Sequence, residues 1–465
     1  MPHVVVIPTA RPTFAVETAQ RRAEQARALL EELGATVAGP TGLVMSPDDL
    51  PEADRHLTAD ADLVINVCAS FSDATPALAL YRDLDRPVVL WSFREPGPVG
   101  DRLWLNSLCG ANLFGHALVR SGGRVCLIHG DPDEPAVRET LREALAGRLP
   151  QVAPPPARHG ERGPADQARR ALDSLRGRRI GVLGEAPAGF TPSEYDPALL
   201  RSRFGLEAAD LTVDDAFERI DKVDEGDRAR ELAAVTAARP SLAGLDPAEV
   251  GRHAAVTSAL RQWAAGDSLA AVAVRCWPEF PVRMGVCPCS SLSRLADEGT
   301  PTVCERDVYG AVTMLLLEAL GAGTTYLVDT VDLDADANLV RLWHCGSAAT
   351  SLAADPGAAT QSVHCNRRIG VAGDFPLRTG PVVMARLTEN ASGGLRLLLT
   401  AGESLPADNR FQGNTAAVRL EADATAFVHG LVTGGFPHHT VLAWTDVRPA
   451  LRTAADLLDI PVIEW

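Results

Sequence analysis

The sequence predicts an α/β protein: two parallel-sheet α/β domains followed by a C-terminal antiparallel β-rich domain that is barrel-like. Over most of the chain, apolar strand-like runs alternate with polar-striped helical segments, which is typical of parallel sheets covered by helices. Towards the C-terminus, short strands separated by glycine-rich turns replace this alternation, which favours a small barrel or sandwich. A chain of 465 residues is also long enough for two or three domains.

We expect the first domain to span residues 1–160. It contains four apolar strand-like runs, and a helical segment at 15–34 follows the first of them. The proline-rich stretch at 151–167, "QVAPPPARHGERGPADQ", is typical of a linker and marks the end of the domain. The four expected strands are residues 3–9, 62–69, 86–92 and 124–130.

A second α/β domain is expected over residues 161–340, and the β-rich domain over 341–465, with a final helix at 446–458. In the second domain the apolar residues from Val308 onward follow helical spacing, so a helix is expected to begin there. The other elements expected in this domain are helices near 213–240 and 247–265, and strands at 178–184, 269–277, 300–304 and 324–331.

Composition argues against several partners and locations. The net charge is −16 and no cluster of basic residues is present, so nucleic acid is not an expected partner. No apolar run approaches the length of a membrane span, and the first residues lack the features of a signal peptide. Several of the nine cysteines lie in strand-like runs, where buried free thiols are expected, and this favours a cytoplasmic location.

The sequence contains a single lysine, Lys222, so Schiff-base chemistry would have to use that residue. It contains neither a Walker-type phosphate loop nor a Gly-x-Gly-x-x-Gly turn after a strand. Enzymes that depend on pyridoxal phosphate, P-loop NTPases and standard dinucleotide oxidoreductases are therefore disfavoured.

Two carboxylates stand at the ends of expected strands, Glu305 after "TPTVC" and Asp329 after "TTYLV". Strand, helix and strand would form a βαβ unit with parallel strands, and both acids would then project from one edge of the sheet. Two adjacent carboxylates repel unless they share a cation, so the pattern indicates a divalent metal. The alternative for Glu305 is a carboxylate in the first turn of a helix, where it complements the helix dipole.

Oxygen ligands with one imidazole suit Mn²⁺, Mg²⁺ or Co²⁺. The candidate imidazoles are His344 in "RLWHCG" and the pair His438 and His439 in "GGFPHHT", although a surface loop explains the pair equally well. Arg275, in "RCWPEF", ends a strand on the same expected edge. It either orients a polyol or pairs with a nearby acid.

Over nearly its whole length the chain resembles the L-fucose isomerase and L-arabinose isomerase superfamily, in particular its fucose-isomerase-like branch. The resemblance is strongest in "RCWPEF", "CERDVYGAVTMLLLEAL", "VDTVDLDADANLVRLWHCG" and "HHTVLAWTDVRPALRTAADLLDIPV". The segments "NSLCGA" and "IPTARPTF" also look like family segments. The chain departs from true L-fucose isomerases in being shorter, and in the loop "GGFP" before the histidine pair.

The resemblance implies a role for each candidate residue. In the family, the glutamate of the C-E-x-D-x-x-G-A motif is a metal ligand and an acid/base, which corresponds to Glu305 here. The carboxylate that closes the next strand has the same two roles, which corresponds to Asp329. A histidine near the C-terminus completes the metal site, and the match favours His439 over His438. His344 falls near a further metal-ligating histidine of the arabinose isomerases, and the implied metal is Mn²⁺.

The resemblance also implies a trimeric or hexameric homo-oligomer with pockets shared between subunits. Arg11 follows the first strand and Trp91 ends the strand at 86–92, so both lie at edges where ligands bind. An arginine fork suits sugar hydroxyls and an indole face suits the apolar side of a sugar. A surface ion pair for Arg11 and a core position for Trp91 are equal alternatives.

The sequence therefore predicts a metal-dependent aldose–ketose isomerase that acts on an open-chain sugar through a cis-enediolate. Glu305 and Asp329 are the expected acid/base pair. One alternative is a homologue that performs another enediolate reaction, such as epimerisation, and another is a non-catalytic sugar-binding protein. The residues expected to bind the sugar are Arg11, Trp91, Arg275, His344 and His438.

Overall fold

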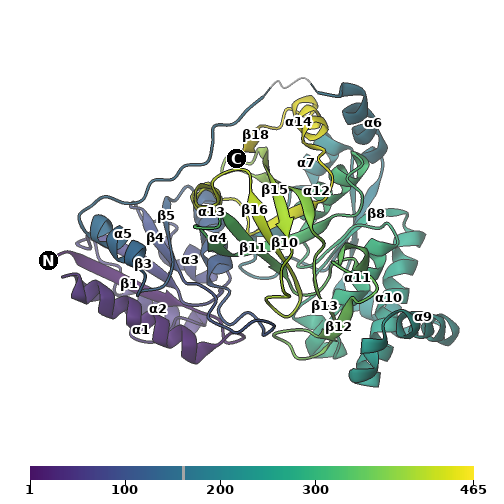
Figure 1. Ribbon diagram of the computed structural model, residues 1–465, viewed down its shortest axis with the longest axis horizontal. Coiled ribbons are helices and arrows are strands. Elements are labelled where there is room, and N and C mark those ends of the chain that lie inside the picture. The colour runs from purple at the N-terminus through teal and green to yellow at the C-terminus, as the bar shows by residue number, and fades with distance from the viewer. Residues whose placement is uncertain (160–162) are drawn as a thin grey trace.

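The computed structural model describes residues 1–159 and 163–465, and it places two α/β units on either side of a β-barrel (Figure 1). The first unit is built on a five-stranded parallel sheet with the order β2-β1-β3-β4-β5. Its strands are runs of Val, Ile and Leu that are buried, as expected for a parallel sheet covered by helices. The strands are β1 (His3–Thr9), β2 (Thr36–Ala38), β3 (Leu63–Cys68), β4 (Val88–Ser92) and β5 (Val125–His129), and the helices are α1 (Val16–Glu32), α2 (Leu50–Asp54), α3 (Thr75–Tyr81), α4 (Ser107–Arg120) and α5 (Pro135–Leu145).

Residues 151–159 of the predicted linker lead away from the first unit towards the top of Figure 1. Residues 151–157 form no helix or strand, and α6 (Ala165–Leu175) begins within the predicted segment. The part at 160–162 lies outside the described residues.

The second unit holds a four-stranded parallel sheet with the order β7-β6-β8-β9. Its strands are β6 (Arg179–Leu183), β7 (Glu207–Leu211), β8 (Leu269–Val274) and β9 (Thr302–Val303), and its helices after α6 are α7 (Pro197–Leu199), α8 (Val213–Asp221), α9 (Glu225–Ala238), α10 (Pro247–Gly266), α11 (Cys289–Asp297) and α12 (Val308–Ala319). Short 3₁₀ or π turns across the chain are η1 (Pro47–Asp49), η2 (Thr191–Ser193), η3 (Leu200–Phe204), η4 (Pro240–Gly244), η5 (Phe280–Met284) and η6 (Thr350–Leu352).

The C-terminal unit is a nine-stranded, mostly antiparallel sheet with the order β12-β13-β16-β11-β10-β17-β14-β15-β18. An additional pairing between β15 and β16 closes the strands β16-β11-β10-β17-β14-β15 into a barrel, so the barrel-like form is confirmed. The strands are β10 (Tyr326–Asp334), β11 (Leu339–His344), β12 (Thr360–Val363), β13 (Gly370–Pro376), β14 (Gly380–Glu389), β15 (Leu395–Leu405), β16 (Asn414–Leu420), β17 (His439–Ala443) and β18 (Val462–Glu464), with helices α13 (Ala424–Thr433) and α14 (Arg448–Leu457).

One predicted pairing is wrong. Strand β10 is not a parallel neighbour of β9; it belongs to the barrel, where it pairs antiparallel with β11 and β17. The βαβ assumption fails because α12 does not return the chain to its own sheet. The helix is buried along residues 308–317 and contacts both the parallel sheet at β8 and the barrel at β14 and β17. A helix that is covered on two sides is apolar around its whole circumference, and the residues of α12 show this pattern.

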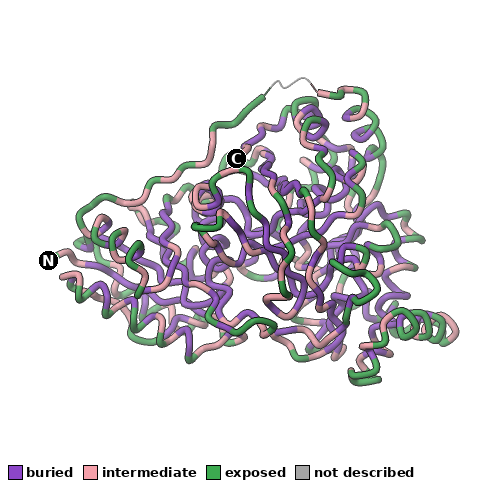
Figure 2. Tube along the Cα trace, viewed as in Figure 1, coloured by how far each residue is buried: buried purple, intermediate pink, exposed green. Residues whose placement is uncertain are grey.

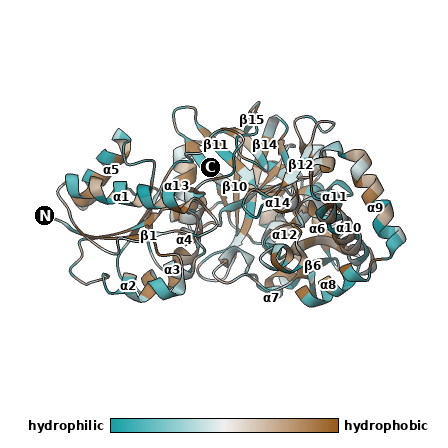
Figure 3. Ribbon diagram, turned by 90° about the horizontal axis from the view of Figure 1, so that it is seen from below, coloured by the Kyte–Doolittle hydropathy of each residue, from teal (hydrophilic) through white to brown (hydrophobic). Residues whose placement is uncertain are grey.

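Helix α4 has the corresponding position on the other side of the barrel, where it contacts β4 of the first sheet and β10. The two helices therefore join the barrel to the two parallel sheets through continuous apolar clusters. Buried backbone runs through the centre of the molecule in Figure 2, whereas the outlying α9 is largely exposed. Figure 3 shows the same contrast in hydropathy, with apolar strands enclosed by helices that have polar outer faces.

All nine cysteines are free and buried, as the sequence analysis predicts. Among the residues that the structure describes, no helix combines the length and the apolar character needed to cross a bilayer.

Candidate functional site

The structure brings Glu305, Asp329 and His439 together, although they come from different units. The Nε2 atom of His439 lies 3.1 Å from Oε2 of Glu305 and 3.4 Å from Oδ1 of Asp329. His438 stands beside them, with its Nε2 atom 4.0 Å and 3.9 Å from the same two oxygens. A surface loop, the alternative interpretation of the histidine pair, does not hold, because both imidazoles are buried.

Barrel register explains why Asp329 and His439 meet. Strands β10 and β17 are antiparallel, and Asp329 is directly opposite His439 in their pairing. Side chains at directly opposed positions point to the same face of a sheet and are close enough to interact. On its other side Asp329 is paired with Trp343 of β11, so His344 at the end of that strand lies near the same point.

Glu305 reaches this point from a loop. Helix α12 begins only at Val308, so the predicted position of Glu305 in the first helical turn is wrong. Glu305 and Arg306 have φ angles of 60° and 58°, and two consecutive non-glycine residues in the left-handed region are unusual. Such strain persists where neighbours hold it in place. Here Arg306 donates to the backbone carbonyls of Gly184 and Ser193, and the Ser193 hydroxyl donates to the Glu305 carbonyl.

Asp307 orients His439. Its Oδ2 atom lies 2.7 Å from Nδ1 of His439, and this contact leaves Nε2 of the imidazole facing the two acids. Its charge is balanced by Arg386, whose Nη1 and Nη2 atoms donate to the carboxylate at 2.5 and 2.8 Å. Asp307 also caps α12, because its Oδ1 atom accepts from the Gly310 amide. A carboxylate behind a histidine is the usual support of a metal-ligating imidazole.

The site shifts the pKa values of its members in opposite directions. Burial raises the pKa of Glu305, but the hydrogen bond and charge of His439 outweigh burial and lower it to about 2. Burial raises the pKa of Asp329 to about 7; His439 opposes the shift and Glu305 adds to it. Burial lowers the pKa of His439, but hydrogen bonds to Asp307 and Glu305 raise it to about 10. The pKa of His344 is lowered to about 4, chiefly by burial.

The donor set fits a divalent cation. Several buried nitrogen and oxygen atoms converge here without a hydrogen-bond partner outside the group in the described structure, which is costly unless a ligand binds them. Carboxylate oxygen with imidazole nitrogen suits Mn²⁺ and similar ions. Two groups meet the spacing required of metal ligands, one formed by Glu305, His438 and His439 and one by Asp329, His344 and His439. Apart from the contacts that they make with one another, the atoms of this group without a hydrogen-bond partner are Glu305 Oε2, Asp329 Oδ1, His344 Nε2 and His439 Nε2.

A pocket of about 750 Å³ that is open to solvent contains these acids. Its wall includes Trp277, whose Nε1 atom donates to Oε1 of Glu305 at 3.2 Å. The ring of Phe190 packs edge-on against both Trp277 and His438, at 5.4 and 5.5 Å between centroids. Arg11 lies over the Trp277 ring, with 4.6 Å between Cζ and the centroid. Arg11 and Glu305 therefore line one pocket of one chain, in contrast to the predicted division between subunits.

Two predicted sugar-binding residues lie elsewhere. Trp91 is fully buried in the core of the first unit, where it contacts Phe93 and donates to the Gly130 carbonyl. Arg275 forms a two-pronged ion pair with Glu279, with N–O distances of 2.9 and 2.6 Å. The core position and the acid pairing, which were the alternative interpretations of these residues, are what the structure contains.

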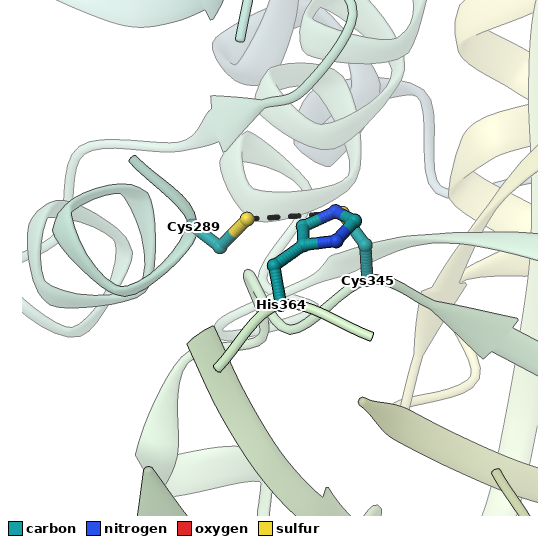
Figure 4. A group of neighbouring side chains, drawn as sticks. All are labelled: Cys289, Cys345 and His364. Carbon is teal, nitrogen blue, oxygen red and sulfur yellow. Dashed lines mark hydrogen bonds between the residues drawn. The ribbon is translucent and has the colours of Figure 1, made fainter. Parts of the chain in front are cut away.

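Soft metal donors lie in another part of the same pocket (Figure 4). The sulfur atoms of Cys289 and Cys345 are 3.8 Å apart, and His364 completes a group with the spacing of metal ligands. The pKa of the Cys345 thiol is raised well above its usual value, first by its contact with Cys289 and then by burial, with Cys304 opposing. This group differs in chemistry from the carboxylate centre, since thiolates select softer ions.

Sequence reasoning missed three residues of the site. Asp307 had a signal, because it is the aspartate of the same C-E-x-D motif that contains Glu305. The indication for Trp277 was weaker, because it lies two residues after Arg275 in the "RCWPEF" segment. Arg367, which also lines the pocket, stands in the turn between β12 and β13 and had no signal.

Comparisons with known proteins agree with this architecture. Residues 342–465 match the family model described as "L-fucose isomerase, C-terminal domain". A sulfoquinovose isomerase of Alkalicoccus urumqiensis is 34% identical over 464 residues, which cover 99% of each chain. The sulfoquinovose isomerase of Priestia aryabhattai is 31% identical over 98% of each chain, and that of Clostridium sp. (strain MSTE9) is 28% identical over 98% of this chain and 97% of its own. The chain belongs to the L-fucose isomerase-like family of aldose–ketose isomerases.

Proposed function

We propose that this enzyme converts sulfoquinovose, a glucose derivative with a sulfonate on C6, into the corresponding ketose by a metal-dependent, cis-enediolate route. The single observation that supports the route best is the meeting of Glu305 and Asp329, which line the pocket, with the buried imidazole of His439. The names of the full-length relatives support the choice of sugar.

Glu305, Asp329 and His439 would hold the metal, and we propose Mn²⁺, with Mg²⁺ or Co²⁺ as alternatives. When bound, such an ion acts as a Lewis acid that acidifies the C2 proton of the sugar and stabilises the negative charge of the enediolate. Asp307 fixes the ring of His439 from behind, so that the imidazole keeps its orientation when a ligand arrives.

The two carboxylates divide the proton transfers. One takes the proton from C2 of the open-chain aldose and returns it to C1, while the other moves the O2 proton to O1. The carbonyl thereby passes from C1 to C2, and no atom is gained or lost. Trp277 and Phe190 provide an apolar wall against the sugar, and His344 and His438 provide polar contacts with it along the same pocket.

An epimerase would use the same enediolate but return the proton to the other face of C2. A non-catalytic sugar-binding protein would have no need for two buried carboxylates with a histidine between them, since such a group is costly to bury without a reaction or an ion. The relatives' names favour the isomerase over both alternatives.

The test is incubation of EDTA-treated enzyme with sulfoquinovose, with and without added Mn²⁺, followed by NMR. We expect a ketose signal only with metal. A second aldose would identify an epimerase, and unchanged sugar with bound metal would leave only binding. Full turnover in the stripped enzyme would end the metal-dependent proposal. Parallel samples with Mg²⁺, Co²⁺ and Zn²⁺ rank the ions.

A further inference from the structure

The pocket that contains Glu305 also contains two guanidinium groups, those of Arg11 and Arg367. The Cζ atom of Arg11 lies 4.6 Å from the centroid of the Trp277 ring, and Cζ of Arg367 lies 6.0 Å from the same centroid. Both arginines are half-buried. Two cations therefore stand beside one aromatic ring inside the pocket that contains the acids.

Neither guanidinium has a carboxylate partner. Among the described residues, no carboxylate oxygen lies within the 4.0 Å of an ion pair from Arg11 or Arg367. Arg275, close by in the sequence to Trp277, is by contrast fully paired with an acid. Burial lowers the pKa of Arg11; Asp73 opposes this shift, and the positive charge of Arg367 adds to it. The two arginines thus repel each other, and the acids that oppose this repulsion, Asp73 and Glu305, act on Arg11 without forming an ion pair with it.

Charge balance makes this pair unusual. The protein has a net charge of −16, so its overall field repels an anionic substrate. Arg386 and Arg94 pair with Asp307 and Glu134, and half-buried arginines without an acid, such as Arg252, donate to backbone carbonyls. Among the described residues, the guanidinium groups of Arg11 and Arg367 have contacts with aromatic rings and no ion pair. Two guanidinium groups without an ion pair make this part of the pocket positive in a protein that is negative overall, and an anion needs such a positive site to bind.

We propose that Arg11 and Arg367 form the binding site for the anionic group of a sulfonated sugar, at the end of the sugar remote from C1. This rests on the proposed function, and it names the residues that select a charged sugar over a neutral one. Trp277 sets the geometry, because its Nε1 atom donates to Glu305 while its ring lies beside both arginines. A sugar that lies along this ring has its reacting carbons at the acids and its far end at the cations.

A sulfonate suits the site chemically. It remains a singly charged anion at any pH where the enzyme is folded, and its three oxygens can accept from two guanidinium forks at once. Arginine keeps its charge when half-buried, whereas a buried lysine loses its proton readily. Arginine at both positions therefore keeps two positive charges available to bind the anion.

The experiment compares two sugars that differ only in the charged group, sulfoquinovose and quinovose, on Mn²⁺-loaded enzyme. Binding is measured by calorimetry and turnover by NMR, for wild type, Arg11→Gln, Arg367→Gln and the control Arg368→Gln. Arg368 is the exposed neighbour of Arg367, and its guanidinium donates only to Gln412. Each of the two pocket variants should weaken sulfoquinovose binding and lower its kcat/KM by roughly 10- to 100-fold, the effect of one hydrogen bond to a charged group.

Quinovose binding and turnover should change by less than about threefold in the same variants, because quinovose does not use the anion site. Mn²⁺ affinity should be unchanged in all of them. Equal binding of the two sugars by the wild type, or equal losses with both sugars in the variants, would overturn the proposal. A higher kcat/KM for glucose 6-phosphate than for sulfoquinovose would assign the arginines to a phosphate and overturn the sulfonate assignment.

The outcomes separate this proposal from the proposed function. If quinovose is isomerised with metal but sulfoquinovose is neither bound nor converted, the isomerase activity is supported and the proposed anion site is refuted. If neither sugar is converted but sulfoquinovose binds at least about tenfold more tightly than quinovose through the two arginines, the anion site stands and the isomerase falls.

Discussion

Replacing Asp307 with asparagine should destabilise the protein and weaken its metal site at the same time. Asp307 is fully buried with Arg386, and their side chains are 0% and 1% exposed. Asparagine keeps one acceptor for the Gly310 amide but removes the charge that faces Arg386 and the acceptor that faces Nδ1 of His439. Leaving one member of a buried ion pair uncompensated costs about 3–5 kcal/mol of unfolding free energy. Loss of a carboxylate behind a metal-ligating histidine lowers metal affinity by about 10- to 100-fold.

Both effects can be measured on the same preparation. Urea unfolding of the EDTA-treated protein gives the stability change, and calorimetric titration with Mn²⁺ gives the affinity. The matched control is Asp374→Asn, because Asp374 is half-buried and accepts only from the Gly413 amide and the Asn409 side chain, contacts that an asparagine oxygen can keep. Stability within about 1 kcal/mol of wild type, together with unchanged Mn²⁺ affinity, would refute the reasoning. A stability loss with unchanged affinity would restrict Asp307 to neutralising Arg386.

Four further outcomes are expected. Burial raises the pKa of Glu318 to about 7, although hydrogen bonds from Thr325 oppose the shift. Between about pH 4.5 and pH 7 the folded protein therefore keeps a proton on Glu318 that the unfolded chain has lost. The free energy of unfolding falls as the pH rises through this range. Glu318→Gln, with its side chain only partly buried, should therefore gain about 1–2 kcal/mol in urea unfolding above pH 7 and nothing below pH 4; a gain at low pH would contradict this sign. Trp277→Phe removes the donor to Glu305 and should lower kcat/KM by roughly 10-fold with little change in stability, and unchanged kinetics would discount that hydrogen bond. Zn²⁺ or Cd²⁺ should inhibit the Mn²⁺-loaded enzyme by binding to Cys289 and Cys345, whose sulfur atoms are 3.8 Å apart. Tetrahedral zinc with Zn–S bonds of about 2.3 Å holds two sulfur atoms at about this separation. Equal inhibition of the Cys289→Ser variant would place the effect elsewhere. Light scattering should give a trimer or hexamer, and a fully active monomer would contradict the assembly that the family resemblance implies.

The sequence was sufficient for the main strands and helices and for the two acids that meet, but not for the route by which they meet, and strands β2 and β7 were missed. Strand 3–9 was found with its observed bounds and the helix from Val308 with its observed start, because their apolar pattern is unambiguous. Strand β10 was assigned to the wrong sheet, because a strand buried on both faces has the same apolar pattern in a barrel as in a parallel sheet. Trp91 was misjudged because position at a strand end fixes the edge but not the face, and its face packs into the core.

The charged triplet "ERD" between β9 and α12 is explained by three separate tasks of adjacent residues. Glu305 faces His439 of the barrel, Arg306 ties the loop to two backbone carbonyls of the second unit, and Asp307 caps the helix while it orients the same histidine. Turning three consecutive side chains to three different neighbours requires a backbone that a helix or a strand does not offer, hence the two left-handed residues. Their cost of about 1–3 kcal/mol each is offset by the hydrogen bonds of Arg306 and by the ion pair behind Asp307. The strain and the function are therefore linked, because a relaxed loop would release Glu305 from the barrel residues with which it shares the site.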